Sequence, residues 1–151
     1  MESERFVPFV LYTERIAKNI KRLADKKMEK YGLRSAHVMC ILQLAKSENG
    51  LSSAELSVAC GVDKAFISRI TAELMEKNYI SRNTGSNKGK YKTKFLLTEQ
   101  GAEINKILNE IITNFINQIN KNTPTKKLEI FYEVLSTIDI GLDAITDKEI
   151  D

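Results

Sequence analysis

The 151-residue sequence predicts a mainly α-helical fold of six helices, with one small β-hairpin between the fourth and the fifth. Three observations predict it. Apolar residues recur at helical spacing in five segments, capping signals mark a further helix, and the very short connection "CGVD" joins the third helix to the fourth. A β-rich stretch with alternating lysines then follows the fourth segment.

The first helix is expected over about residues 4–31, ending near Tyr31-Gly32. Its apolar residues recur at close to 3.6 residues: Phe9, Tyr12, Ile16, Ile20 and Leu23. A second helix is expected to begin near Ser35, where a further apolar series starts: Val38, Ile41, Leu42 and Leu44.

The third and fourth helices are predicted with the tightest connection in the chain. Ser52 and Glu55 have the spacing of a capping box, which marks the start of the third helix, and Gly61 is suited to its end. Only Val62 separates Gly61 from Asp63, a good N-cap for the fourth. Two helices joined by so short a turn must cross at a steep angle.

The fourth helix is expected to bury Ile67, Ile70 and Leu74. Two strands follow, Tyr79 to Thr84 and Tyr91 to Leu97, around the turn sequence "GSNKG". Because side chains alternate along a strand, the second strand places its lysines on one face and its apolar residues on the other. The lysines are Lys90, Lys92 and Lys94.

The last two helices are predicted to be long. Thr98 can cap a fifth helix running to about Asn120, and Thr123-Pro124 supplies an N-cap and a first-turn proline for the sixth. The sixth carries a heptad-like apolar stripe: Leu128, Phe131, Leu135, Ile138, Leu142 and Ile145. Such a stripe suits pairing with a second helix, either in a second copy or within the same chain.

Positive charge is concentrated in one part of the sequence. Residues 61–95 contain eight basic residues and three acidic ones, although the whole chain has a formal net charge of only +3. This asymmetry favours a polyanionic partner for that surface. Steeply crossed helices followed by a charged hairpin form a winged helix-turn-helix, whose second helix fits the major groove of DNA. The alternatives are a solvated basic strand, or a module whose basic face binds an acidic protein.

Two segments carry a resemblance to a known family. They are "LSSAELSVACGVDKAFISRITAELMEKNYISR", residues 51–82, and "LLTEQG", residues 96–101. In their order and spacing the chain resembles the MarR family of bacterial transcriptional regulators over nearly its whole length. The resemblance implies a single domain over residues 1–151, with a DNA-binding lobe at about 35–98 and dimerisation helices at about 4–31 and 98–146.

The resemblance also implies which residues bind DNA. The fourth helix would be the recognition helix, with leading residues Lys64, Ala65, Phe66, Ser68 and Arg69 facing the DNA. Phosphate contacts would fall at two helix starts, Arg34 with Ser35 and Ser52 with Ser53, where backbone N–H groups favour anions. The family's Asp-x-Arg wing motif falls on Gly89 and Tyr91 here, so the role of its arginine would pass to Lys88, Lys90 and Lys92.

The family further implies a homodimer that binds a pseudo-palindromic operator, most often as a repressor released by a small aromatic or phenolic acid. Tyr12, Arg15 and His37 could line such a ligand site, with Arg15 or His37 meeting a carboxylate. The alternative is that Tyr12 and His37 are core or interface residues and that Arg15 is a surface charge.

Other classes of function find little support. No phosphate-binding glycine loop or nucleophile–histidine pairing indicates an enzyme, and a single histidine makes a histidine-based metal site improbable. No metal or cofactor is expected. Cys40 and Cys60 are interpreted as small buried residues, with a thiol-based redox-responsive regulator as the alternative. The polar N-terminus "MESERF" and the lack of a long apolar run predict a cytoplasmic protein.

Overall fold

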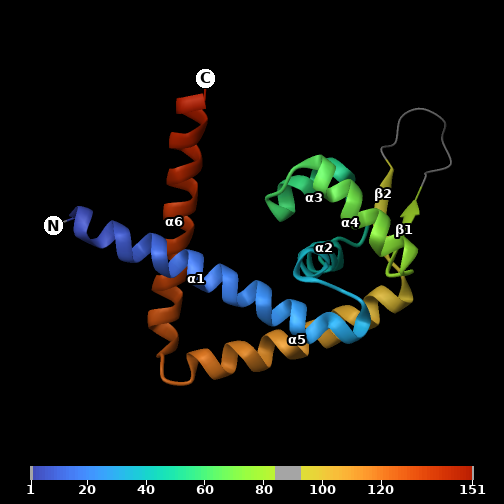
Figure 1. Cartoon of the computed structure of the whole chain (residues 1–151), viewed down its shortest axis with the longest axis horizontal. Helices are drawn as coiled ribbons and strands as arrows, with labels where there is room; N and C mark the ends of the chain where they lie inside the picture. Colours follow the sequence, from blue (N-terminus) through green and yellow to red (C-terminus); the bar gives the residue numbers. More distant parts are fainter. Residues whose placement is uncertain (1, 84–92, 151) are drawn as a thin grey trace. The chain divides into compact units, whose positions relative to one another are not determined.

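The computed structural model describes residues 2–83 and 93–150. Within them the expected fold is confirmed: it is mainly helical, with one two-stranded hairpin (Figure 1). The α-helices are α1 (Glu2–Met28), α2 (Ser35–Ala45), α3 (Ser53–Cys60), α4 (Lys64–Glu76), α5 (Glu99–Asn120) and α6 (Thr125–Ile150). A short 3₁₀ helix, η1 (Glu29–Tyr31), follows α1, and the strands are β1 (Ile80–Asn83) and β2 (Lys94–Leu97).

Contacts along the chain group into two compact units, Met1–Asn109 and Glu110–Asp151. In the first unit, α1 continues through η1 to Tyr31, and Gly32 ends it with a left-handed φ of +65°. The Gly32 N–H donates to the Glu29 carbonyl at 2.9 Å. This carbonyl, at the end of the helix, would otherwise have no hydrogen-bond donor. The expected end near Tyr31-Gly32 is therefore confirmed.

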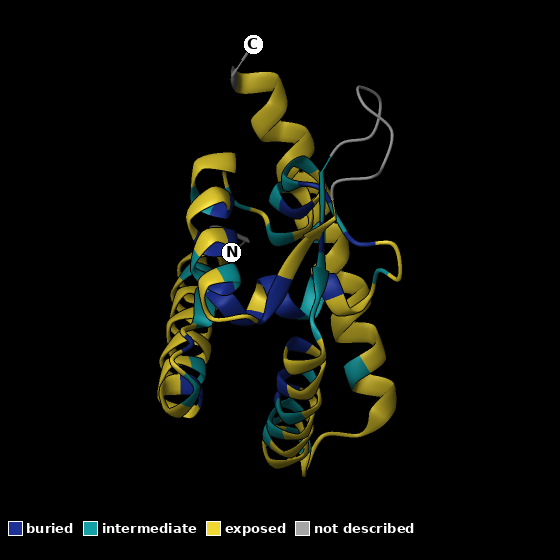
Figure 2. Cartoon of the chain, turned by 90° about the vertical axis from the view of Figure 1, so that its right-hand side faces the viewer, coloured by how far each residue is buried: buried dark blue, intermediate teal, exposed yellow. Residues whose placement is uncertain are grey.

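The core of the first unit lies among α2, α3, α4 and the base of the hairpin (Figure 2). The predicted apolar face of α4 is confirmed, since Ile67, Ile70 and Leu74 are all buried. The buried aliphatic residues of the neighbouring helices are Val38, Ile41 and Leu44 of α2, Leu56 of α3, and Ile104 and Leu108 of α5. Truncating one such side chain to alanine typically costs about 2–5 kcal/mol.

The hairpin strands pair antiparallel, with Ile80 opposite Leu97 and Asn83 opposite Lys94. A third segment joins them, because Leu51 exchanges two backbone hydrogen bonds with Phe95, at 3.0 and 2.8 Å. The described strands are shorter than predicted.

Tyr79 lies before β1 rather than within it. Its ring is buried and its hydroxyl donates to the Tyr31 carbonyl at 3.0 Å. Thr84 and Tyr91, which were expected to lie in the strands, fall outside the described residues.

The junction between β2 and α5 confirms the cap expected at Thr98. The Gly101 N–H donates to the Thr98 hydroxyl at 3.0 Å, as an N-cap requires. Gly101 also lies against the backbone of Tyr79, where an added Cβ would be only 2.0 Å from the Tyr79 carbonyl oxygen. The glycine of the "LLTEQG" segment is therefore explained by a close approach of two backbone segments.

The second unit contains the end of α5 and the whole of α6. The predicted start of α6 is wrong by one residue: the helix begins at Thr125, and the Pro124 carbonyl accepts the Leu128 N–H at 3.3 Å. Pro124 therefore occupies the N-cap rather than the first helical position. No described helix combines the length and the apolar character that crossing a membrane requires.

Candidate nucleic-acid interface

Local hydrogen bonds fix the turn between α3 and α4. Ser52 and Glu55 form the predicted capping box, with the Ser52 N–H donating to the Glu55 carboxylate at 2.7 Å and the Ser52 hydroxyl accepting from the Glu55 N–H at 3.3 Å. Gly61 ends α3 with a φ of +63°, and the Asp63 carboxylate accepts the Phe66 N–H at 2.7 Å to begin α4. All the caps predicted around this turn are confirmed.

The leading end of α4 presents small and basic side chains to solvent. Lys64, Ala65, Ser68 and Arg69 are exposed, whereas Phe66 is half-buried. The Arg69 guanidinium lies 5.6 Å from the centre of the Phe66 ring, a cation–π distance. The structure therefore brings these five predicted residues together over the first two turns of one helix.

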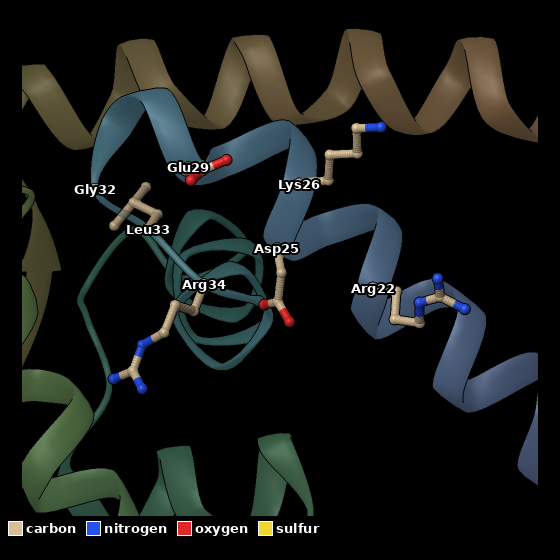
Figure 3. A pocket seen from close by; sticks show the side chains of 7 residues that line it. All are labelled: Arg22, Asp25, Lys26, Glu29, Gly32, Leu33 and Arg34. Atoms are coloured by element: carbon tan, nitrogen blue, oxygen red, sulfur yellow. The ribbon is translucent and has the colours of Figure 1, made fainter.

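The start of α2 differs from the phosphate-binding site that the family resemblance implies. The Ser35 N–H donates to the Asp25 carboxylate at 2.7 Å, and the Arg34 N–H donates to His37 Nδ1 at 2.9 Å. Figure 3 shows Asp25 extending from α1 toward this first turn, while the Arg34 side chain points away from Asp25. Two of the N–H groups expected to attract a phosphate are thus already bonded within the protein.

Arg34, His37 and Glu73 form a network between α2 and α4. Glu73 Oε2 lies 2.7 Å from Arg34 Nη2 and 2.8 Å from His37 Nε2. Because His37 Nδ1 accepts a backbone N–H, its proton is on Nε2, which donates to Glu73. Burial lowers the pKa of His37, partly opposed by Glu73, and the hydrogen bonds from Arg34 and His37 lower the pKa of Glu73.

The remaining residues predicted to contact phosphates differ in burial, and some of them lie outside the described residues. Ser52 is buried and its hydroxyl is occupied in the cap, whereas Ser53 is half-buried at the first position of α3. The wing residues Lys88, Lys90 and Lys92 lie outside the described residues. Lys94, at the described base of the wing, is half-buried, with its Nζ 3.5 Å from the Gly50 carbonyl oxygen.

A second basic segment was missed by the sequence analysis. Residues 15–34 contain eight basic residues and only two acidic ones, a larger excess than in residues 61–95. Arg15, Lys18, Arg22 and Lys26 of α1 are all exposed. A charge count in successive windows would have found this segment, which the near-neutral total for the rest of the chain concealed.

The residues predicted for a ligand are not brought together. A groove of about 580 Å³ lies between α1, α2 and the α3–α4 turn, and none of Tyr12, Arg15 and His37 is among its lining residues. Tyr12 and Arg15 are exposed on α1, before the first lining residue Ala17. His37 is buried, and both of its ring nitrogens are hydrogen-bonded within the protein. In the structure His37 is a core residue. This agrees with the alternative to the ligand-site prediction, in which His37 belongs to the core or to an interface.

The groove is mostly apolar and adjoins the recognition helix. From the first two helices it is lined by Ala17, Ile20, Lys21, Ala24, Ser35, Ala36, Val38 and Met39, and from the end of α3, the turn and α4 by Cys60, Gly61, Val62, Phe66 and Ile67. Lys21 supplies the one charged side chain among these residues.

The cysteines differ in accessibility. Cys40 is buried, which raises the pKa of its thiol to about 12, and Cys60 is half-buried with a raised pKa. Because the thiolate is the reactive form, burial disfavours oxidation of both residues near neutral pH. Among the described residues, no group of three or more His, Cys, Asp or Glu side chains could hold a metal ion.

Comparisons with known proteins agree with this geometry. Residues 31–89 match the sequence pattern of the MarR family, while no curated protein matches the chain. A MarR/EmrR family transcriptional regulator from Acinetobacter sp. ADP1 is 21% identical, with a TM-score of 0.79 over 93% of this chain and 97% of that chain.

Two further structures have the same fold and contain a partner. MepR from S. aureus, in a complex with DNA, is 16% identical, with a TM-score of 0.79 over 89% of this chain and 97% of that chain. CouR from Rhodococcus jostii RHA1, bound to p-coumaroyl-CoA, is 17% identical, with a TM-score of 0.75 over 87% of this chain and 90% of that chain.

MarR family regulators are DNA-binding proteins without enzymatic activity, which agrees with the absence of a catalytic motif in the sequence. The family match covers residues 31–89, and the solved structures share the fold along nearly the whole chain, so the protein has the fold of the MarR family winged-helix regulators.

Proposed function

We propose that the protein is a ligand-responsive transcriptional repressor that binds a pseudo-palindromic DNA operator as a homodimer. The exposed leading face of α4 is the observation that carries the proposal, because it presents Lys64, Ser68 and Arg69 directly after a rigid turn. The presence of DNA in the MepR structure, which has the same fold, supports the assignment.

The chemistry of the α4 face suits the major groove. Ala65 and Ser68 are small, so the helix backbone can approach the bases closely, and the Arg69 guanidinium can donate two hydrogen bonds to a guanine. Lys64 and Arg34 are assigned to phosphates, which position the protein without specifying sequence. Lys88, Lys90 and Lys92 are assigned to backbone contacts of the wing, because an ammonium lacks the planar donor pair of arginine.

The helices outside the DNA-binding lobe are assigned to dimerisation. On this proposal residues 35–98 form the lobe, and residues 4–31 and 98–146 form the dimer. The apolar side chains Phe131, Leu142 and Ile145 of α6 are exposed, as are Ile16 and Ile20 of α1. A second copy would cover such surfaces, and its two-fold symmetry would place two half-sites about one helical turn apart.

The groove beside α4 is assigned to the effector. Its apolar lining and the single Lys21 suit a small aromatic acid, whose carboxylate would meet the ammonium. Phe66 and Ile67 belong to both the groove and the recognition helix, so an occupant could change the position of α4. The p-coumaroyl-CoA in CouR supports an aromatic acyl ligand for this fold.

Replacing Arg69 tests the DNA-binding proposal. In anisotropy titrations against the DNA upstream of its own gene, Arg69→Ala should weaken binding by about tenfold or more, because a bidentate base contact contributes roughly 1–3 kcal/mol. Affinity for a random duplex should fall much less.

Lys121→Ala, which removes one exposed positive charge from the α5–α6 turn, is the matched control and should retain operator affinity. If the wild type shows neither a preference for the operator nor a steep decrease of affinity with salt, the proposed function is wrong. An unchanged affinity of Arg69→Ala would instead exclude α4 as the recognition helix.

A further inference from the structure

A chain of polar contacts runs from the protein interior to the surface between α2 and α4. His37 is only 1% exposed, and its Nε2 donates to Glu73 Oε2 at 2.8 Å. The same Glu73 oxygen accepts from Arg34 Nη2 at 2.7 Å, and the Arg34 side chain is 62% exposed. A buried imidazole therefore anchors a carboxylate, and that carboxylate anchors an exposed guanidinium.

The backbone of Arg34 is fixed as well. Its own N–H is bonded to His37 Nδ1, and the next N–H, of Ser35, is bonded to Asp25. The base of the Arg34 side chain and its Nη2 are thus held at two separate points. An unrestrained arginine side chain loses its conformational freedom when it binds a phosphate, and a side chain that is already held loses less.

Arg34 keeps the capacity to bind a phosphate while it is held. A guanidinium has five N–H donors, and the pairing with Glu73 runs through Nη2. The carboxylate can therefore remain bonded while other donors of the same guanidinium meet an anion. Because α4 carries both Glu73 and the exposed residues Ser68 and Arg69, the orientation of Arg34 is tied to the helix proposed to contact bases.

We propose that Glu73 is a positioning residue, which holds Arg34 in the geometry that binds a DNA phosphate and couples this contact to the placement of α4. This inference rests on the proposed function, since it concerns DNA binding. It assigns a role to an acidic residue of the recognition helix, where an uncompensated negative charge would oppose binding to DNA.

The test is a double-mutant cycle on operator binding at several salt concentrations, using Arg34→Ala, Glu73→Gln and the combined variant. Arg34→Ala should make the negative slope of log K against log salt shallower by about 0.9, the value for one phosphate contact. Glu73→Gln should weaken operator binding by about three- to tenfold, and it should cause no further loss when Arg34 is already alanine.

Glu76→Gln is the matched control, because it makes the same chemical change on an exposed residue of the same helix. It measures the general effect of removing a negative charge near DNA. An equal loss from Glu73→Gln in both Arg34 backgrounds would overturn the proposal, since Glu73 would then act through α4 alone. Tighter binding of Glu73→Gln than of Glu76→Gln would also overturn it, because Glu73 would then compete with DNA for Arg34.

A measurement without DNA separates this inference from the proposed function. The ¹⁵N order parameter of the Arg34 Nε–H group should be high in the wild type and should fall in Glu73→Gln. Equal order parameters in the two proteins would show that Glu73 does not hold Arg34, whatever the protein binds. A wild type that orders Arg34 but shows no operator preference would refute the proposed function and leave the Glu73–Arg34 contact established.

Discussion

The single histidine of the chain is placed by contacts that sequence spacing does not reveal. His37 lies at the third position of α2, where its Nδ1 accepts the N–H of the residue before the helix. This is the task that glutamate performs in a capping box. Its other nitrogen meets Glu73, which is 36 residues away in sequence. The long-range partner, and the burial that comes with it, could be found only from the folded chain.

The buried His37 predicts a specific dependence of stability on pH. Its pKa in the folded protein is lowered from about 6.5, chiefly by burial. Below pH 6.5 the unfolded chain binds a proton that the folded protein does not, so the free energy of unfolding should decrease as the pH falls. The decrease should approach at most about 1.4 kcal/mol per pH unit until the folded pKa is reached.

Urea unfolding of the wild type and of His37→Gln between pH 7.5 and 5 measures this contribution. The variant should be less stable at pH 7.5, and its stability should change less over the interval. Glu73, whose pKa is lowered from 4.5, contributes stability that is lost only at lower pH, so it does not obscure the measurement. Parallel pH profiles for the two proteins would contradict the assignment to His37.

At the level of single elements, the sequence was most informative where the signal is local. The caps at Ser52, Asp63 and Thr98 were predicted correctly, because each bonds to an N–H within three residues. The DNA-contacting residues of α4 were instead assigned from the resemblance to the MarR family, which this short segment of the sequence carries. The groove was not predicted, since its lining comes from four segments of the chain and no spacing within one segment brings Lys21 to Phe66.

Two glycines within helices allow a matched test of element packing. At Gly101 of α5 an added Cβ would lie 2.0 Å from the Tyr79 carbonyl oxygen, whereas at Gly141 of α6 it would meet nothing within 4 Å. Gly101→Ala should therefore destabilise the protein by several kcal/mol, because backbone atoms must separate. Gly141→Ala should stabilise it by about 0.5–1 kcal/mol, because alanine has the higher helix propensity.

The midpoint of urea unfolding distinguishes the two outcomes. The midpoint should fall for Gly101→Ala and rise for Gly141→Ala if the close backbone contact at the β2–α5 junction leaves no room for a Cβ at position 101. Similar shifts in the two variants would mean that the α5 start can move away from Tyr79, and that the glycine of "LLTEQG" is not required by packing.

Across the whole molecule, apolar surface is distributed unevenly between the two units. The first unit has a buried core, whereas the described side chains of α6 are exposed or half-buried, including the heptad-like stripe. Large contiguous apolar surfaces on a protein usually mark an interaction site. The stripe itself was evident in the sequence, but its partner was not, because a regular apolar seam suits a helix of the same chain and a helix of a second copy equally well.

A charge placed in the stripe tests the proposed dimer. Leu135→Lys should dissociate it, because an ammonium would be buried against apolar side chains of the partner subunit. Ser136→Lys adds the same charge at the neighbouring exposed position, outside the stripe, and should leave the dimer intact.

Sedimentation equilibrium should give twice 17.1 kDa for the wild type and the control, and 17.1 kDa for Leu135→Lys, with unchanged helical circular dichroism. Operator affinity should fall by about 100-fold or more, since two linked half-sites bind far more tightly than one. A monomeric wild type, or a Leu135→Lys variant that remains dimeric, would show that the stripe serves another purpose. A monomer with full operator affinity would show that a single winged helix suffices, and that the DNA site need not be pseudo-palindromic.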